Sequence, residues 1–393
     1  MHTHTTRRQA LLWLASSAPL LSAGPAVWAA SATAPATPDP RLVVVMLRGA
    51  LDGLAAVPAT GDPAWPTLGR ADGDGVVLPL DGFFGLHPSL AGLHRWYQAG
   101  QLLVVHAVAS PYRDRSHFDA QQVLESGGAR PFVHSDGWLG RALQMGGGTA
   151  MALSPAMPLA LQGAEQARTW TPARRQGPDT PFMDRVTDMY RADPLLARAW
   201  AAAMAQEGMA RGMQASNPAM GNTPGGDAGW VATAQQAGAF LSAPAGPRVA
   251  WLDVDGWDTH AQQAGRLQRL LAALDQGLLA LRAALEPFWD QTTVVVVTEF
   301  GRTAALNGTG GTDHGTGGVA LVAGGAVAGG RVWADWPGLA QPQLLDGRDL
   351  RPTTDLRALW SAVVQRQWGL DPAQVAGRVL PGYTGAGLGL WHV

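Results

Sequence analysis

Residues 292–325 read TTVVVVTEFGRTAALNGTGGTDHGTGGVALVAGG, and this stretch decides the fold. The β-branched run 292–298 has the composition of a strand buried on both faces, as in a parallel sheet covered by helices. Polar residues follow at once, and a second apolar run begins at Val319. Because open α/β sheets bind ligands where their strands end, we expect the functional site here. The side chains that this stretch supplies are Glu299, Arg302, Asp313 and His314.

The composition excludes several kinds of chemistry. The chain has 393 residues, 47% of them hydrophobic and 15% charged, which is enough for a large core. A net charge of -2 without long charge runs gives no support for nucleic acid as a partner. There is no cysteine, and all 28 basic residues are arginine. Thiol nucleophiles, thiolate metal sites and Schiff-base lysines are therefore excluded, and oxygen and imidazole chemistry is left.

The first 30 residues are typical of an export signal. Arg7 and Arg8 precede an apolar run that ends in small residues, and they resemble the twin-arginine signal, which an export machinery reads as an address. Pro19 and Pro25 make the run a poor spanning helix, although a simple membrane anchor is the alternative. We expect residues 31–40 to be a linker. The mature protein would be periplasmic or extracellular, without a stable membrane span after processing.

Two further polar positions follow predicted strands. Asp52 comes after the strand 41–47, where it could bind a cation or cap the next element. Ser116 follows the strand 102–108 and is a plausible N-cap of the next helix. Its hydroxyl would suit attack on a phosphate or sulfate, with an arginine such as Arg115 holding the anion. The alternative is that Ser116 only caps the helix and the arginines pair with neighbouring aspartates.

Residues 131–247 give weaker signals. Turn residues alternate with short apolar pieces, and 157–163 is the best strand candidate among them. The pattern is helical over 184–210 and then dissolves into Met, Asn, Pro and Gly. We therefore expect an irregular insertion in a single domain that spans 41–393.

A carboxylate and an imidazole follow the next strand, 248–254. Asp258 and His260 are separated by one residue, which suits a loop that turns both side chains toward one ion. An isolated pair of this kind can equally be a hydrogen-bonded turn. A long amphipathic helix follows and stops near Pro287.

The four strands, which begin near residues 41, 102, 248 and 292, are each followed by polar residues and then by a helical or long connection. This repetition predicts a mainly parallel sheet with right-handed crossovers and all these strand ends on one edge. A metal-assisted hydrolase is the function that such an edge favours. The residues expected to converge are Asp52, Ser116, Asp258, His260, Glu299, Arg302 and His314.

Several motifs carry a family resemblance. LRGALDGL, RSHFDAQQVLESGG, GWDTH, VVTEFGRT and TDHGTGG resemble the exported bacterial family called domain of unknown function 1501 (DUF1501). That family is similar to the alkaline phosphatase and sulfatase superfamily. The resemblance implies a three-layer αβα sandwich with two metal ions at the strand ends beside a Ser, Thr or formylglycine nucleophile.

The resemblance also assigns roles to single residues. Ser116 resembles the nucleophile, and Asp52 matches the carboxylate after the first strand. Asp258, His260 and His314 resemble the ligands of one metal. The pair that should serve the other metal is replaced by Glu299 and a phenylalanine, which cannot bind a metal. Alanine stands in the cysteine place of the sulfatase C-x-P-x-R motif, so formylglycine is excluded there.

Two functions follow as hypotheses. The first is an exported hydrolase of small-molecule or polymer-borne phosphate or sulfate esters, with Arg115 or Arg302 holding the anion. Asp313 would be a further ligand or support, and Glu299 with Asp52 could hold a second ion. Zinc suits two imidazoles and a carboxylate, while manganese, magnesium or calcium would suit a carboxylate-rich site. The second hypothesis is a non-catalytic binding or structural protein of the cell envelope that keeps a degraded site. Substrate and oligomeric state are left open.

Overall fold

The β-branched run of the sequence forms strand β8 (Thr292–Thr298), every residue of which is buried. In the part of the chain that the computed structural model describes, β8 lies inside a nine-stranded sheet in the order β10-β4-β9-β8-β1-β7-β5-β6, with β11 paired to β4. The other strands are β1 (Arg41–Leu47), β4 (Leu102–Ala109), β5 (Ala150–Leu153), β6 (Ala167–Thr169), β7 (Val249–Val254), β9 (Gly318–Ala323), β10 (Arg331–Trp333) and β11 (Thr354–Asp355).

The strand directions confirm the mainly parallel sheet. β1 pairs in parallel with both β7 and β8. β9 pairs antiparallel with β8 and with β4, so β4 runs in the same direction as β8. The carboxyl ends of all four predicted strands therefore lie on one edge of the sheet. Because β9 runs the opposite way, it begins on that same edge.

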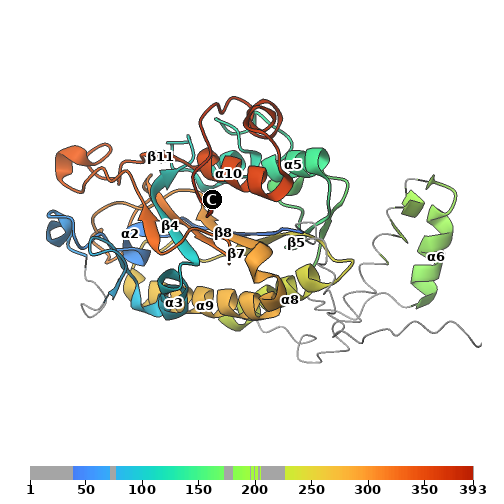
Figure 1. Cartoon of the computed structure of the whole chain (residues 1–393), viewed down its shortest axis with the longest axis horizontal. Coiled ribbons are helices and arrows are strands. Elements are labelled where there is room, and N and C mark those ends of the chain that lie inside the picture. Colours follow the sequence, from blue (N-terminus) through green and yellow to red (C-terminus); the bar gives the residue numbers. More distant parts are fainter. Residues whose placement is uncertain are drawn as a thin grey trace, which may run out of the picture. The chain divides into compact units, whose positions relative to one another are not determined.

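Helices cover both faces of the sheet, as Figure 1 shows, which confirms the three-layer αβα class. Alternate residues of β1 point to opposite faces. Val43 and Val45 belong to the hydrophobic cluster on the side of α3, α8 and α9, whereas Val44 and Met46 belong to the cluster on the side of α5 and α10. The covering helices are α3 (Ala91–Gln98), α8 (Asp227–Ser242), α9 (Gln263–Ala284), α5 (Trp138–Gly146) and α10 (Leu356–Trp368).

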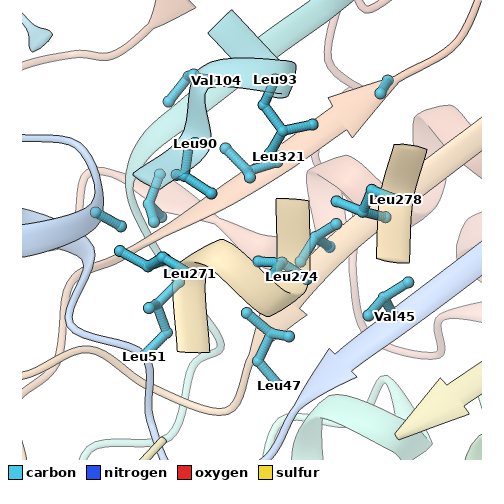
Figure 2. Packing of buried hydrophobic residues seen from close by; sticks show 14 of the residues in the cluster. Val45, Leu47, Leu51, Leu90, Leu93, Val104, Leu271, Leu274, Leu278 and Leu321 are labelled. Carbon is cyan, nitrogen blue, oxygen red and sulfur yellow. The ribbon is translucent and has the colours of Figure 1, made fainter. Parts of the chain in front are cut away.

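Helix α9 illustrates how the layers pack. Leu271, Leu274 and Leu278 recur at the spacing that places side chains on one helix face, and all three are buried. In Figure 2 they lie in one cluster with Val45 and Leu47 of β1. Arg266, Gln268 and Arg269 lie on the exposed face of α9, whereas Asp275 is buried and accepts from the backbone at the start of α3. This apolar face fixes the helix over the sheet and so fixes the loop that joins β7 to it.

The described residues are 39–70, 77–171, 180–194, 196–198, 200, 201, 204 and 226–392, and they fall in one unit, Asp39–Val393. The predicted export signal, 1–30, and all but the last two residues of the predicted linker lie outside them. None of the described helices has the length and hydrophobicity that crossing a membrane requires. The remaining elements are α2 (Gly53–Ala56), η1 (Trp65–Leu68), β2 (Leu78–Pro79), β3 (Gly85–Leu86), η3 (Pro88–Leu90), α4 (His117–Ser126), η4 (Leu159–Leu161), α6 (Thr180–Tyr190), η6 (Glu286–Gln291), η7 (Gln341–Gln343), α11 (Pro372–Gln374) and the π-helical η8 (Val375–Val379).

Residues 131–247 contribute more regular structure than their sequence indicates. They supply α5 and α8 to the two helical layers, and β5 and β6 to the sheet. The expected strand at 157–163 is wrong, because this segment contains the 3₁₀ turn η4. The strand lies at β5 instead, whose four residues, AMAL, have no β-branched side chain to signal it.

Candidate metal centre

Three histidines and one aspartate meet at the carboxyl edge of the sheet. His117 is the first residue of α4, which follows β4. Asp258 and His260 lie in the loop between β7 and α9, and His314 lies in the loop between β8 and β9. The strand directions explain the convergence, because β4, β7 and β8 end at this edge and β9 begins there.

The ligand atoms of these side chains are close together. Nε2 of His314 lies 3.0 Å from Nε2 of His117 and 3.0 Å from Nε2 of His260. Asp258 Oδ1 lies 2.9 Å from His260 Nε2 and 3.3 Å from His314 Nε2, and its Oδ2 lies 3.5 Å from His117 Nε2. Ligands of one zinc ion are each about 2.0–2.2 Å from the metal, so separations of this order place these atoms within reach of a shared cation. His117, Asp258 and His314 form such a group by distance alone.

Each imidazole is held through its other nitrogen. His117 Nδ1 lies 2.8 Å from Glu299 Oε1, and His260 Nδ1 lies 3.3 Å from Asp313 Oδ1. His314 Nδ1 lies 3.0 Å from the carbonyl oxygen of Arg115. Since all three partners are acceptors, each Nδ1 carries the hydrogen and each Nε2 presents its lone pair to the cluster. This is the arrangement by which proteins orient metal-binding histidines.

Lone pairs that face one another at 3.0 Å repel unless a proton or a cation lies between them. The hydrogen bond to Glu299 raises the pKa of His117 above its ordinary value, against the effect of burial. Burial and the neighbouring charge of His117 lower the pKa of His314. Without metal, these opposite shifts favour a proton on His117 Nε2 that is donated to His314. A metal ion would take the place of that proton.

Arg302 holds the aspartate of the cluster. Its Nη1 donates to Asp258 Oδ1 at 2.6 Å, its Nε donates to the Thr312 hydroxyl at 3.2 Å, and its Nη2 donates to the Thr312 carbonyl. Burial alone would raise the pKa of Asp258, but the hydrogen bond and charge of Arg302, together with His260 and His117, outweigh burial and the pKa is lowered. The guanidinium is buried and fully engaged, so it keeps the carboxylate ionised and aimed at the histidines.

Glu299 lies behind His117 instead of facing the cluster. Its Oε1 accepts from His117 Nδ1, from Gln121 Nε2 at 3.0 Å and from Gly49 N at 2.9 Å, and its Oε2 accepts from Thr298 at 2.9 Å. Burial would raise the pKa of Glu299, but the bond from His117 and the other donors lower it overall. The glutamate is thus a charged support for the imidazole.

Gly49 allows the two loops of this edge to approach. Its φ of +113° is one that side chains rarely adopt, and a Cβ there would lie 2.6 Å from the backbone nitrogen of Asp258. Only glycine can therefore bring the end of β1 against the loop after β7 and still offer its N–H to Glu299.

Asp313 lies beside the cluster, whereas Asp52 lies outside it. Asp313 is exposed, supports His260 and accepts from Asn307 Nδ2 at 3.1 Å, and this last bond contributes most to lowering its pKa. Asp52 is not brought into the cluster. It is buried, caps α2 through the N–H of Ala55 at 3.0 Å, and forms an ion pair with Arg70 at 3.0 Å.

Ser116 takes the N-cap position of α4, directly before His117, and makes no side-chain capping bond. Tyr112, four residues earlier, donates to Asp119 at 3.2 Å. Burial raises the pKa of Tyr112, and hydrogen bonding from Ser116 opposes the rise. Ser116 is thus next to His117 in the chain, and its hydroxyl makes no bond to the helix backbone.

Arg115 does not face the cluster with its guanidinium. Its Nε donates to Asp349 Oδ2 at 2.8 Å, and its Nη2 donates to Asp346 Oδ2 at 2.8 Å. The part of Arg115 that reaches the site is its backbone carbonyl, which accepts a hydrogen bond from His314 Nδ1.

Phe300 fills the space beside two of the histidines. Its ring centre is 4.9 Å from that of His117 and 5.2 Å from that of His314, and the residue is buried. An apolar ring therefore packs against these two imidazoles and offers no ligand atom on this side of the cluster.

The sequence analysis missed His117. Its position between Ser116 and Asp119 is typical of a helix start, and attention went to the serine. The usable signal was its place in the polar segment between the buried strand β4 and the next helix, as Asp258 lies between β7 and α9.

A family model described as "Protein of unknown function (DUF1501)" matches residues 100–380. No curated protein matches the chain. Among solved structures, the chain is similar to a protein in the alkaline phosphatase superfamily from Vibrio parahaemolyticus (TM-score 0.40, 12% identity, covering 84% of this chain and 67% of that one). It is also similar to a 2-O GAG sulfatase (TM-score 0.38, 12% identity, 88% and 72%). A third is the C-terminal periplasmic domain of EcEptC from Escherichia coli in complex with zinc (TM-score 0.38, 8% identity, 72% and 73%).

Proposed function

The chain belongs to the DUF1501 family, as its motifs predict, and from its site we propose that it is a metal-dependent hydrolase of phosphate or sulfate esters. The observation that carries the proposal is the convergence of three imidazole Nε2 atoms on one carboxylate, with every Nδ1 held by an acceptor. Such an arrangement stabilises a cation and has no comparable role in a hydrogen-bonded turn.

The residues fit a zinc ion better than a harder cation. His117, His260, His314 and Asp258 would hold it, and nitrogen-rich sets of this kind favour zinc over magnesium, manganese or calcium, which prefer oxygen. Glu299 and Phe300 leave no second ligand set next to them, so we propose one ion. When bound, it would supply positive charge that polarises the ester and activates a hydroxyl or water.

Ser116 is the proposed nucleophile. It precedes a metal ligand in the chain, and its hydroxyl makes no capping bond. Attack by its oxygen on phosphorus or sulfur would break the bond to the ester oxygen and release the alcohol. Tyr112 is a neutral phenol that donates to Asp119 Oδ2 at 3.2 Å, so the displaced proton would pass through its hydroxyl to the Asp119 carboxylate. Water would then cleave the phosphoryl or sulfuryl serine.

The setting of this activity is also a proposal. Arg7 and Arg8 favour passage through the twin-arginine machinery, after which the protein would act in the periplasm or outside the cell on a small-molecule or polymer-borne ester.

One observation favours the alternative of a non-catalytic envelope protein that binds a metal. Arg115 and Arg302, the arginines expected to hold the substrate anion, are engaged by acids and backbone carbonyls. A hydrolase built on this site would therefore bind the anion through the metal, without an arginine clamp.

The test is the zinc content and ester hydrolysis of the exported protein purified without chelators. We expect about one equivalent of zinc, lost in His314→Ala, because His314 contacts both other histidines. The matched control is His94→Ala, which removes a histidine of α3 on the far side of the sheet from α10. Equal zinc in wild type and His314→Ala would overturn the metal site.

A second substitution separates the two functions. Ser116→Ala keeps every proposed ligand, so it should retain zinc and lose hydrolysis of model phosphate and sulfate esters. If the wild-type protein binds zinc but hydrolyses neither phosphate nor sulfate esters, the enzymatic function is overturned and the metal-binding function is kept.

A further inference from the structure

Asp349 is a buried carboxylate with three partners around His314. It is 0% exposed and lies in the loop before β11, a region that the sequence analysis did not single out. Its Oδ2 lies 2.8 Å from Arg115 Nε and accepts from the Thr316 hydroxyl at 2.9 Å. Its Oδ1 lies 3.1 Å from Arg348 Nε. Each of these partners is next to His314 or binds it.

The contact with Arg115 reaches the imidazole through the backbone. Arg115 has a φ of +61°, a left-handed conformation that is unfavourable for a residue with a Cβ. Its carbonyl oxygen is the acceptor for His314 Nδ1 at 3.0 Å. The ion pair with Asp349 anchors the side chain of this strained residue and so holds the carbonyl against the ring.

The other two contacts hold the loop that carries His314. Arg348 Nη2 donates to the backbone carbonyl of His314 at 2.7 Å. Thr316, two residues further on, is buried and bonded to Asp349. The carboxylate thus fixes both the backbone position of His314 and the acceptor for its ring.

We propose that Asp349 is a positioning residue that holds His314 in its Nδ1–H tautomer, with Nε2 directed at His117 and His260. It touches no ligand atom of the cluster itself. A purely structural carboxylate would neutralise the two arginines without any effect on the state of an imidazole. The consequence for metal affinity rests on the proposed function, whereas the tautomer can be observed in metal-free protein.

The test uses the mature protein labelled with ¹⁵N-histidine and the variant Asp349→Asn, which keeps the size and removes the charge. In metal-free wild type, long-range ¹H–¹⁵N spectra should show His314 as Nδ1–H. In D349N we expect this signal to shift toward the Nε2–H form, and zinc affinity, measured by chelator competition, to fall about 10-fold to 100-fold.

Asp275→Asn is the matched control, because Asp275 is also a buried aspartate but accepts from Gly92 and Leu93 at the start of α3. It should leave the His314 spectrum and the zinc affinity unchanged. A folded D349N with a wild-type His314 spectrum would overturn the proposal, whether or not the protein binds zinc. If D349N does not fold, Thr316→Val decides: we expect a smaller shift of the same sign, and an unchanged spectrum would overturn the proposal.

Discussion

Asp52 and Asp258 both follow buried strands at the same edge of the sheet, yet they serve different purposes. Asp52, after β1, is 1% exposed. Arg70 pairs with it, Gln263 Nε2 donates to it at 3.0 Å, and it caps α2. Asp258, after β7, has a side chain that is 42% exposed and lies among three imidazoles.

The difference teaches that position at a strand end is not enough to make a ligand. A carboxylate whose oxygens are already satisfied by a buried arginine, an amide and a backbone N–H has no lone pair directed at a site. Asp258 also binds an arginine, Arg302, but on one oxygen, and its other oxygen faces His117. The two aspartates therefore predict opposite effects of the same substitution.

Asp52→Asn should have the largest effect on folding. Asparagine can still cap α2, but it leaves the charge of Arg70 buried without a counterion. Removing one partner of a buried ion pair costs about 3–5 kcal/mol. We expect the free energy of unfolding in urea to fall by about that amount while zinc stoichiometry is unchanged. Loss of zinc from folded D52N would mean that the two aspartates belong to one site after all.

Asp258→Asn should reverse this pattern. It removes the one carboxylate among the proposed ligands, and partners one step further from a metal already contribute about 10-fold to 100-fold in affinity. Zinc affinity should therefore fall by about 100-fold or more, as measured by competition with a chromogenic chelator. The unfolding curve, recorded without metal, should change less than that of D52N. A larger loss of stability than in D52N, with zinc retained, would contradict the comparison.

Most of the fold could be predicted because its signals are local. The apolar runs that became β1, β4, β7 and β8, with polar residues after each, are sufficient to predict a parallel sheet and its functional edge. Helix α8 was missed because its alanine-rich sequence, DAGWVATAQQAGAFLS, shows little amphipathic contrast and follows a stretch of turn residues. The position of α8 is decided by its packing against α9. Such a contact between distant parts of the chain cannot be read from a local sequence pattern.

The site was predictable in its location but only partly in its membership. Asp258, His260 and His314 are brought together as expected. The role of Glu299 was beyond the sequence, because whether a carboxylate faces a metal or the back of a histidine depends on a rotamer. Asp52 could not be separated from the true cluster, because its partner Arg70 lies 18 residues away.

Glu299, at the same edge of the sheet, is a carboxylate that is neither a proposed ligand nor a helix cap, and its substitution should change how zinc affinity depends on pH. Glu299 raises the pKa of His117, and a metal must displace the His117 proton, so zinc affinity of the wild type should begin to fall at a pH above 6.5, the ordinary histidine value. Glu299→Gln loses an orienting charge and should bind zinc about 10-fold more weakly at pH 8. Its His117 pKa is lower, however, so its zinc affinity should begin to fall at a lower pH than that of the wild type. The difference in affinity between the two proteins should therefore shrink as the pH falls.

Chelator competition between pH 8.5 and 5.5 measures the zinc affinity of both proteins. Glu125→Gln is the control, since this buried glutamate bonds to Arg48 and Ala160 but to no histidine. Parallel curves for wild type and E299Q would show that Glu299 does not act through His117.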